Sequence, residues 1–476
     1  MTETESIAYD VVVIGGGPVG ENVADRTRAA GLSTALVESE LLGGECSYWA
    51  CMPSKALLRP VIAQADARRL PGLAESVRGP LTAPEVLARR DQFTSHWKDD
   101  GQVSWLEGTG TSLYRGQGRV AGPRTVTVTA PDGTVTTLTA RQAVAVCTGT
   151  RAQLPDLPGL AEVKPWTSRE ATSAKAAPGR LIVVGGGVVA TEMATAWHAL
   201  GSRVTLLVRG KGLLNRMEPF AGELVAEALT EAGVDVRTGT SVASVTREDG
   251  TVVAVTGTGE RIEADEILFA TGRVPGTDDI GLDTVGLEPG SWLDVDDTLR
   301  VTGTDWLYAV GDVNHRALLT HQGKYQARIA GAAIAARAAG GPVLDEPWGA
   351  HAATADHDAV PQVVFTDPEA AAVGLSLAEA EQAGHRVRAV DVEFSSVSGA
   401  SLYGDGYQGR ARMVVDLEDE ILRGVTFVGP GVGELIHSAT VAVAGRVPVS
   451  RLWHAVPSYP TLSEVWLRLL EAYRDK

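Results

Sequence analysis

The chain has 476 residues, more than one ordinary hydrophobic core accommodates, so we expect several domains. Its 59 Asp and Glu residues outnumber 42 Lys and Arg, and the net charge of -17 without a compensating basic run argues against nucleic acid or an anionic membrane as a partner. The polar start, MTETESIAYD, does not read as a secretion signal, and no unbroken apolar stretch reads as a membrane span, so we expect a cytoplasmic protein.

The first predicted elements form a nucleotide-binding unit. In chain order they are a strand at 10–14, a glycine turn at 15–20, a helix at about 21–30 and a strand at 34–37. Gly15 and Gly17 permit a tight turn that brings backbone amides close to a pyrophosphate, and Gly20 lets the helix pack closely on the strand. The second strand ends at Glu38, where a carboxylate can accept hydrogen bonds from a ribose hydroxyl. We therefore predict a first dinucleotide site here.

The same order of elements recurs farther along the chain. It comprises a strand at 181–184, a glycine turn at 185–190, a helix to about 200 and a strand at 204–208. Gly185 and Gly187 repeat the motif, whereas Ala190 replaces its third glycine. The last strand runs into Arg209, with Arg216 nearby, instead of ending in an acid. Guanidinium groups pair with a ribose 2′-phosphate, so a second site that favours NADPH over NADH is predicted, with solvated surface cations as the alternative.

Two hairpins and two small-residue turns complete the predicted layers. The stretches 125–140 and 242–263 are each predicted to form antiparallel excursions around a central turn. The segments 270–272 and 309–312 each end an apolar strand in small residues, and ligands bind at such strand ends in doubly wound sheets. The predicted cofactor contacts outside the two glycine motifs are Gly44, Gly149, Gly272, Gly311 and Asp312.

Three cysteines are too few for a disulfide framework in a chain of this length. Cys147, in the apolar run AVAVCTG, is predicted to be a small buried strand residue. Cys46 and Cys51 lie five positions apart directly after the first unit, which favours a redox pair. On a regular helix that spacing separates them by about 7.5 Å along the axis, at or beyond disulfide reach, so the helix must be distorted there or begin after Cys46.

The segment from Gly43 to Lys55, with the pattern Cys-x4-Cys-x-Pro-Ser-Lys, resembles the active-site signature of the pyridine nucleotide-disulfide oxidoreductases. This is the family of lipoamide dehydrogenase, glutathione reductase and mercuric reductase, and the resemblance covers almost the whole chain. It implies FAD and a nicotinamide cofactor, with Cys51 as the thiolate against the flavin and Cys46 as the interchange thiol. It also implies that Lys55 lies near flavin N5 and pairs with Glu192, and a lysine with helix-terminal amides would hold Cys51 as thiolate.

The sequence departs from the family at its last motif. Most members have His-Pro-Thr-x-x-Glu, supplied by the partner subunit, and the histidine acts as acid and base for the interchange thiol. Here the motif begins with Tyr459. Tyrosine has an ordinary pKa near 10, which makes it a proton donor and a poor base at neutral pH. His454 could in principle substitute, but two intervening prolines restrict the chain and an ordinary surface or interface histidine is favoured.

Glu464 ends the same motif and has two interpretations. It is a catalytic position in the family, but Thr461 followed by Glu464 ahead of the apolar run 465–470 is also the pattern of a helix capping box. Mercuric reductases too carry an aromatic residue at the position of Tyr459. No cysteine follows Cys147, however, so the carboxyl-terminal cysteine pair that hands over mercury in those enzymes is absent, and we predict no metal site.

The predicted fold is α/β, with two Rossmann-like dinucleotide-binding domains and a carboxyl-terminal α/β dimerisation domain. The expected boundaries are residues 1–150 and 271–345 for FAD, 151–270 for the nicotinamide cofactor, and 346–476 for dimerisation. The resemblance also implies a homodimer in which Tyr459 faces Cys46 across a twofold interface.

Three functions stay open on the sequence. The favoured one is an NADPH-dependent flavoprotein that reduces the Cys46–Cys51 pair and then a small disulfide or another thiol-reactive acceptor. In the second, the flavin itself reduces a quinone or similar small-molecule acceptor, and the cysteines are a vestige or tune the flavin. The third is a non-catalytic redox sensor or scaffold that binds FAD and NADP. The sequence does not identify the acceptor.

Overall fold

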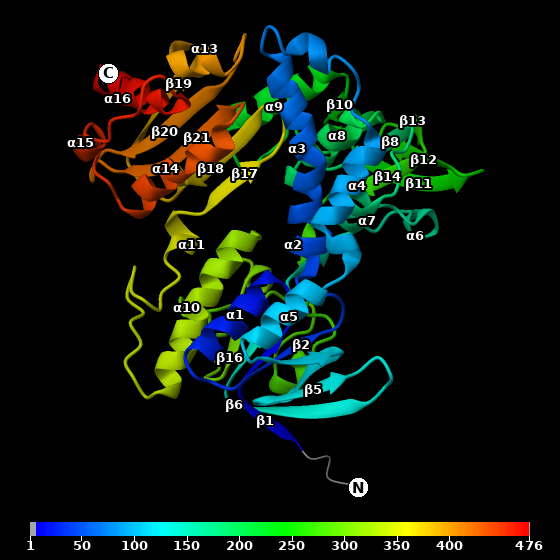
Figure 1. Ribbon diagram of the computed structural model, residues 1–476, viewed down its shortest axis with the longest axis vertical. Helices are drawn as coiled ribbons and strands as arrows, with labels where there is room; N and C mark the ends of the chain where they lie inside the picture. Colours follow the sequence, from blue (N-terminus) through cyan, green and yellow to red (C-terminus); the bar gives the residue numbers. More distant parts are fainter. Residues whose placement is uncertain (1–5, 476) are drawn as a thin grey trace. The chain divides into compact units, whose positions relative to one another are not determined.

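The computed structural model describes residues 6–475, so the first five residues of the polar amino-terminal segment lie outside the described residues. The described chain divides into two compact units (Figure 1). The first unit contains residues 6–52, Asp91–Gln153 and Arg273–His357, and the second contains Pro53–Arg90, Leu154–Gly272 and 358–475. The division into three domains, with boundaries near residues 150, 270 and 345, stays a prediction.

The first unit is built on a sheet with strand order β3-β2-β1-β6-β5-β4, and β16 pairs with β6. The strands are β1 (Ile7–Ile14), β2 (Thr34–Glu38), β3 (Ser112–Arg115), β4 (Gln117–Gly122), β5 (Thr125–Thr129), β6 (Val135–Val146) and β16 (Leu307–Ala309). β1 runs parallel to both of its neighbours, and Val11, Val12 and Val13 are 0% exposed, which is typical of a parallel strand covered on both faces. β5 and β6 form the predicted hairpin, which is confirmed.

Three helices pack against this sheet, α1 (Pro18–Ala29), α5 (Asp100–Gly108) and α10 (Thr320–Ala338). Two shorter helices, α2 (Gly44–Tyr48) and α11 (Ala355–Asp358), carry further residues that matter below. α1 begins at Pro18, earlier than the predicted start at Glu21, because proline fits the first helical position, where an N–H has no intrahelical partner. α1 and α10 pack closely, since a Cβ added at Gly323 would lie 2.6 Å from Val19 Cγ2. A small pair of strands, β7 (Thr150–Ala152) and β15 (Arg273–Pro275), lies outside the main sheet.

The second unit contains a parallel sheet with strand order β10-β9-β8-β14. Its strands and the helices between them are β8 (Arg180–Val184), α8 (Val188–Ala199), β9 (Arg203–Val208), α9 (Pro219–Ala232), β10 (Asp235–Thr238) and β14 (Glu266–Phe269). This order reproduces the predicted second nucleotide-binding unit. The second predicted hairpin is confirmed by β11 (Val242–Glu248) and β12 (Thr251–Thr256), to which β13 (Arg261–Ala264) adds a third strand.

The carboxyl-terminal part of the second unit is an antiparallel sheet with strand order β17-β18-β21-β20-β19. Its strands are β17 (Pro361–Val364), β18 (Glu369–Gly374), β19 (Val387–Glu393), β20 (Arg410–Asp416) and β21 (Leu422–Gly429). Its helices are α12 (Leu377–Gln382), α13 (Ser398–Tyr403), α14 (Val432–Ala444), α15 (Val449–Leu452) and α16 (Val465–Arg474). The remaining helices of this unit are α3 (Cys51–Arg68), α4 (Ala83–Phe93), α6 (Leu160–Val163) and α7 (Ser168–Ser173), of which α3 and α4 extend into the first unit.

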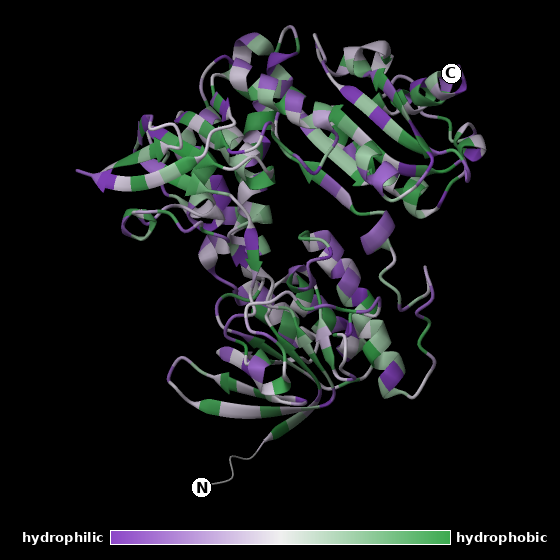
Figure 2. Ribbon diagram, turned by 180° about the vertical axis from the view of Figure 1, so that it is seen from behind, coloured by the Kyte–Doolittle hydropathy of each residue, from purple (hydrophilic) through white to green (hydrophobic). Residues whose placement is uncertain are grey.

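The predicted α/β class is confirmed. Figure 2 shows hydrophobic segments along the strands of both units and hydrophilic bands on the helices, the pattern expected when sheets form the cores. Within residues 6–475, no helix combines the length and the apolar character needed to cross a bilayer.

Candidate functional site

The first glycine turn is closely packed at two of its glycines and open at the third. Gly15 has φ +100°, and a Cβ there would lie 2.5 Å from the Cys147 carbonyl oxygen, so a larger residue does not fit. A Cβ at Gly20 would lie 1.9 Å from the Gly15 carbonyl oxygen, which explains how α1 lies so close to β1. At Gly17 a Cβ would meet only Gly44 Cα, at 4.0 Å. The open position lies at the start of α1, where backbone N–H groups favour an anion.

Glu38 lies where β2 ends and turns its carboxylate toward the same glycine turn. One oxygen accepts from the Gly16 N–H at 2.6 Å, and the other accepts from the Glu40 N–H at 2.7 Å. Burial raises the pKa of Glu38, and the two backbone donors oppose that shift. Each oxygen keeps a further lone pair, so ribose hydroxyls can still donate to it. The open glycine turn and this acceptor therefore fit the pyrophosphate and ribose of a dinucleotide such as FAD.

The other cofactor residues predicted for this site come together from distant parts of the first unit. Asp312 follows β16, and its Oδ2 accepts from Thr150 Oγ1 at 2.7 Å, while burial raises the pKa of its carboxyl. A Cβ at Gly311 would lie 3.0 Å from Val19 in the first turn of α1. Gly149 has φ +63° and open space at its Cβ position.

Gly44 and Gly272 complete the predicted cofactor set. Gly44 begins α2, and a Cβ there would lie 2.7 Å from Gly17 Cα, so α2 approaches the glycine turn closely. Gly272 has φ +154° and follows β14 in the second unit. The structure thus groups Gly17, Gly44 and Glu38 around one turn, whereas Gly272 lies in the other unit, after β14.

The two neighbouring cysteines lie on different helices. Cys46 is in α2, the helix breaks at Trp49, where φ is -138° and ψ is 2°, and α3 begins at Cys51. The predicted distortion between the cysteines is therefore confirmed. Both cysteines are partly exposed, whereas Cys147 is buried just after β6, and burial raises the pKa of its thiol. Cys147 is accordingly unsuited to thiolate chemistry.

Cys51 has a neighbour that the sequence did not reveal. Its Sγ lies 3.2 Å from Oγ1 of Thr320, the first residue of α10, so a hydroxyl and the starts of two helices meet at this sulfur. Helix starts and hydroxyl donors both favour a thiolate. A threonine at the start of an apolar helical pattern was the available signal, but nothing in the sequence links it to a cysteine 269 positions away.

Lys55 and Glu192 form the ion pair that was predicted. Lys55 follows Cys51 by one turn of α3, and its Nζ lies 2.8 Å from Glu192 Oε2 on α8. The Glu192 side chain is 3% exposed, and its other oxygen accepts from the Phe365 N–H at 3.0 Å. Lys55 Nζ also lies 4.9 Å from the centre of the Phe365 ring. The lysine is therefore held by a carboxylate and an aromatic face within the second unit.

The second glycine turn repeats the packing of the first. Gly185 has φ +138°, and a Cβ there would lie 2.3 Å from the Ala270 carbonyl oxygen. At Gly187 a Cβ would meet nothing within 4 Å, so this turn too is open at the start of its helix. Ala190 is 0% exposed, and its methyl would lie 3.4 Å from a Cβ on Gly185, so the replacement of the third glycine fits without displacing the turn.

The cations predicted for a ribose phosphate lie just beyond β9. Arg209 follows the last residue of the strand, and both it and Arg216 are exposed. Within the described part of the chain, neither guanidinium forms an ion pair. Lys211, between them, is exposed as well.

The carboxyl-terminal motif differs from one expectation. Tyr459 is 77% exposed and lies ahead of α16 in the second unit, and His454 is exposed too. The predicted capping box at Thr461 is wrong, because the Thr461 hydroxyl donates to the Ser458 carbonyl and caps no helix. Glu464 is buried at 7% exposure, and its carboxylate does not take part in a cap with Thr461.

The Glu464 carboxylate serves another helix instead. It accepts from the Gly399 N–H at 3.1 Å, in the first turn of α13. The two segments are in close approach, since a Cβ at Gly399 would lie 2.0 Å from the Thr461 carbonyl carbon. The Gly399 N–H at the start of α13 therefore binds the Glu464 carboxylate, which the spacing from Thr461 had predicted to cap its own helix.

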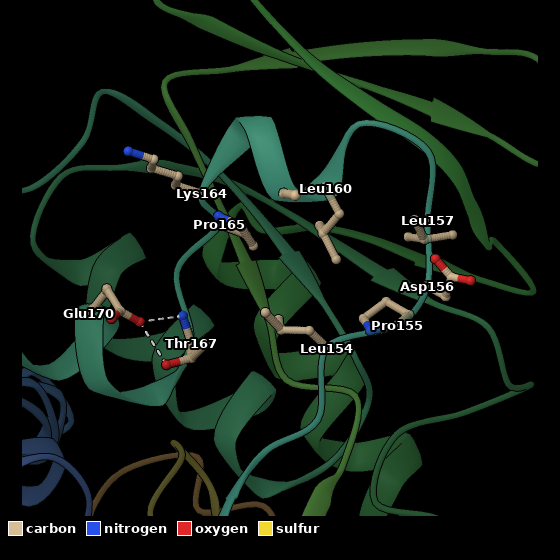
Figure 3. Close-up of a pocket in the computed structure, with 10 residues that line it drawn as sticks. Leu154, Pro155, Asp156, Leu157, Leu160, Lys164, Pro165, Thr167 and Glu170 are labelled. Atoms are coloured by element: carbon tan, nitrogen blue, oxygen red, sulfur yellow. Dashed lines mark hydrogen bonds between the residues drawn. The ribbon is translucent and has the colours of Figure 1, made fainter.

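Two cavities in the second unit lie away from the predicted site residues. One, of about 500 Å3, is lined by the segment that leads to α6 and α7, including Leu154, Leu160 and Lys164 (Figure 3). Here Glu170 accepts from the backbone and hydroxyl of Thr167, which caps α7. The other cavity, of about 680 Å3, lies among α3, α8 and α9. Over residues 6–475 we find no group of three or more His, Cys, Asp or Glu side chains that could hold a metal ion.

Comparison with known proteins gives consistent matches over nearly the whole chain. Residues 9–339 match the family described as pyridine nucleotide-disulphide oxidoreductase, and residues 360–470 match its dimerisation domain. A dihydrolipoyl dehydrogenase from Thermus scotoductus is 33% identical, over 98% of this chain and 97% of the relative. A mercuric reductase from Staphylococcus aureus is 29% identical over 96% and 81%, and a glutathione reductase from Burkholderia cepacia is 29% identical over 97% and 98%.

Solved structures share the fold. LpdA from Mycobacterium tuberculosis superposes with a TM-score of 0.82 at 25% identity, covering 98% of this chain and 99% of that one. The HOCl-induced flavoprotein disulfide reductase RclA from Escherichia coli, solved as a Cu(II) complex, has a TM-score of 0.82 at 22% identity over 98% and 99%.

Proposed function

The chain belongs to the pyridine nucleotide-disulphide oxidoreductase family, and on that premise we propose that it is an NADPH-dependent flavoprotein that reduces its own Cys46–Cys51 disulfide and then a small disulfide or another thiol-reactive acceptor. One observation carries the proposal. Cys46 and Cys51 lie on either side of a helix break, and Cys51 lies 3.2 Å from the Thr320 hydroxyl. This surrounding favours a thiolate on Cys51.

In the proposed reaction, some residues of the chain bind FAD and the two cysteines carry the electrons to the acceptor. Bound FAD supplies the transfer of two electrons from the nicotinamide to sulfur, and Gly17, Glu38 and Asp312 would hold it. The Cys46–Cys51 S–S bond breaks when it takes up the two electrons, giving a thiolate on Cys51 and a thiol on Cys46. Cys46 gives up its proton and attacks the acceptor disulfide, which releases one half of the acceptor and leaves the other half bonded to Cys46. The Cys51 thiolate then attacks the Cys46 sulfur, which breaks that mixed disulfide, releases the second half and forms the Cys46–Cys51 bond again. The two released thiolates take up the proton from Cys46 and one further proton.

Protons and charge require further groups in this proposal. Thr320 donates a hydrogen bond to the Cys51 thiolate. Lys55, held by Glu192, supplies a positive charge one helical turn after Cys51. Tyr459 of the partner subunit of a homodimer would donate a proton to the thiolate that leaves the acceptor, and the exposure of Tyr459 in a single chain agrees with a place at such an interface. We further propose that the protein works in the cytoplasm.

A preference for NADPH is supported by the exposed cations after β9, because a 2′-phosphate pairs with guanidinium groups. Replacing Arg209 and Arg216 together by serine is expected to raise KM for NADPH about 10- to 100-fold while leaving KM for NADH within about twofold. Arg203, an exposed cation at the other end of the same strand, gives a matched control, and Arg203→Ser should leave both constants unchanged. Equal losses for the two coenzymes would contradict the preference.

The disulfide pathway is tested by Cys46→Ser. We expect this variant to keep NADPH oxidation by its flavin in a single turnover and to lose steady-state reduction of disulfide acceptors by at least about a thousandfold. Cys147→Ala, which removes the buried thiol, is the control and should keep turnover.

A second candidate function is direct reduction of a quinone or similar acceptor by the flavin. Two points support it. By the resemblance of the last motif, Tyr459 takes the position of the family's base, and the Glu464 carboxylate accepts from the Gly399 N–H. Undiminished turnover of Cys46→Ser with a quinone, together with no turnover of any disulfide by the unaltered protein, would establish this second function and refute the first.

A further inference from the structure

A buried hydrogen-bond network lies behind the Gly311–Asp312 turn of the first unit. It joins Gln322 and Gln326 of α10 to Asp356 of α11, and their side chains are almost wholly buried, at 4%, 0% and 8% exposure. Four buried polar side chains, with Asn314 as the fourth, are expensive unless every donor and acceptor is paired. None of these residues belongs to the glycine, cysteine or carboxyl-terminal motifs.

In this network each amide NH2 group of Gln322 and Gln326 donates toward Asp356, and the Gln326 oxygen accepts on the side of Gly311. Asp356 accepts from Gln322 Nε2 at 2.7 Å on Oδ1 and from Gln326 Nε2 at 2.9 Å on Oδ2. Gln326 Oε1 then accepts from the Gly311 N–H and from Asn314 Nδ2, both at 2.8 Å. Asn314 Nδ2 also donates to the Ala309 carbonyl at 3.0 Å. The chain of bonds thus runs from a carboxylate through one amide to the backbone of the cofactor turn.

The charge on Asp356 determines which way the Gln326 side-chain amide is oriented. A carboxylate only accepts hydrogen bonds, so the Gln326 amide must turn its NH2 end toward Asp356 and its oxygen toward Gly311. An apolar residue at 356 would remove this preference. Arg316 Nη1 lies 3.8 Å from Asp356 Oδ2 and 2.9 Å from Asp297 Oδ1, and His357 Nε2 lies 2.8 Å from the same Asp297 oxygen. These charges surround the carboxylate without taking over its bonds to the amides.

The target of the network is a strained part of the FAD site. Gly311 has φ +86° and ψ -152°, a conformation reserved for glycine. A glycine peptide without an anchor can rotate, and Asp312, which accepts from Thr150, follows directly. We propose that Asp356 is a positioning residue: acting through Gln326, it holds the Gly311 peptide and thereby Asp312 in the conformation that receives FAD. The proposal rests on the binding of FAD proposed above.

The donor pattern can be reversed by two substitutions, which gives a sharp test. In Q326E two carboxylates face each other and no proton donor lies between them. In the double variant D356N/Q326E, the new asparagine keeps an oxygen for Gln322 and offers its NH2 to the glutamate. The glutamate still accepts from Gly311 and Asn314, so the total charge and every bond of the network are restored.

The measurement is the rate at which FAD leaves the purified holoenzyme after dilution, followed by the rise in flavin fluorescence. We expect D356A and Q326E each to release FAD about 10- to 100-fold faster than wild type, the penalty for buried groups left without partners. D356N/Q326E should return to within about threefold of wild type. Asp297→Ala, which removes a neighbouring partly exposed carboxylate outside the amide network, should leave the rate unchanged. The melting temperature of each apoprotein, measured in parallel, reports on folding.

The possible results distinguish a role of Asp356 in positioning the Gly311 turn from a contribution to folding stability alone. If D356A releases FAD at the wild-type rate, or if D356N/Q326E releases FAD no more slowly than Q326E alone, Asp356 does not act through the direction of the Gln326 amide and the inference is wrong. Losses in melting temperature without any change in FAD release would refute it equally. Wild-type protein that retains no FAD would overturn this inference together with the proposed function, whereas FAD-binding wild type with unaffected variants would overturn only this inference.

Discussion

Glu21, in the first turn of α1, is a carboxyl group in a poor environment for a charge. Its Oε1 is wholly buried and has no hydrogen-bond partner among the described residues. Burial raises its pKa from 4.5 to about 7, Lys324 opposes the shift, and the charge of Glu38 adds to it. We predict that Glu21→Gln stabilises the protein in a pH-dependent way.

The magnitude follows from the displacement of the pKa. A shift from 4.5 to about 7 corresponds to about 3 kcal/mol, because each pKa unit is worth about 1.36 kcal/mol. The folded state holds the proton more tightly than the unfolded chain. The stability of the wild type is therefore fully retained below about pH 4.5, falls as the pH rises toward about 7, and is constant above that. Glutamine cannot ionise and escapes this loss.

Urea unfolding between pH 4.5 and pH 8.5 would measure the effect. We expect Glu21→Gln to match the wild type near the acid end and to exceed its unfolding free energy by up to about 3 kcal/mol at the alkaline end. Glu85→Gln, an exposed carboxyl in the first turn of α4, is the control and should give a small difference that does not vary in this way. A constant difference between Glu21→Gln and wild type at every pH would refute the reasoning.

Four further substitutions test the packing at the sites. Gly185→Ala should cost about 2–4 kcal/mol in unfolding free energy, because a Cβ would lie 2.3 Å from a backbone oxygen. Gly187→Ala, where nothing lies within 4 Å, should leave unfolding within about 0.5 kcal/mol and raise KM for NADPH at least about tenfold. Glu464→Ala should cost about 2 kcal/mol because the Gly399 N–H loses its acceptor. Thr461→Ala should cost less than about 1 kcal/mol, and a larger loss would revive the capping box.

The parts of the molecule that local spacing determines were predictable. Glycine turns between a strand and a helix need backbone conformations that few other residues adopt, so the turns at Gly15 and Gly185 mark both nucleotide-binding layers. The hairpins were predictable for the same reason. The helix break between Cys46 and Cys51 followed from elementary geometry.

Contacts between distant segments were not predictable, because nothing in a single sequence encodes which polar groups will share a buried space. Thr320 meets Cys51 across 269 positions, and Glu464 meets Gly399 across 65. For Glu464 the capping-box pattern predicted the wrong partner, because the unpaired Gly399 N–H at the start of α13 binds the same carboxylate. The network of Asp356 behind the cofactor turn was missed for the same reason.

The central claim is that electrons from NADPH reach the Cys46–Cys51 pair, and an anaerobic titration with NADPH tests it most directly. Flavin absorbance and free thiols are measured together as the coenzyme is added. We expect a long-wavelength thiolate-to-flavin absorption band to grow while two new thiols appear per chain. In Cys46→Ser, where Cys51 has lost its disulfide partner, the band should be present before any NADPH is added, and NADPH should produce no new thiols. A flavin that bleaches without the band and without new thiols would contradict the account.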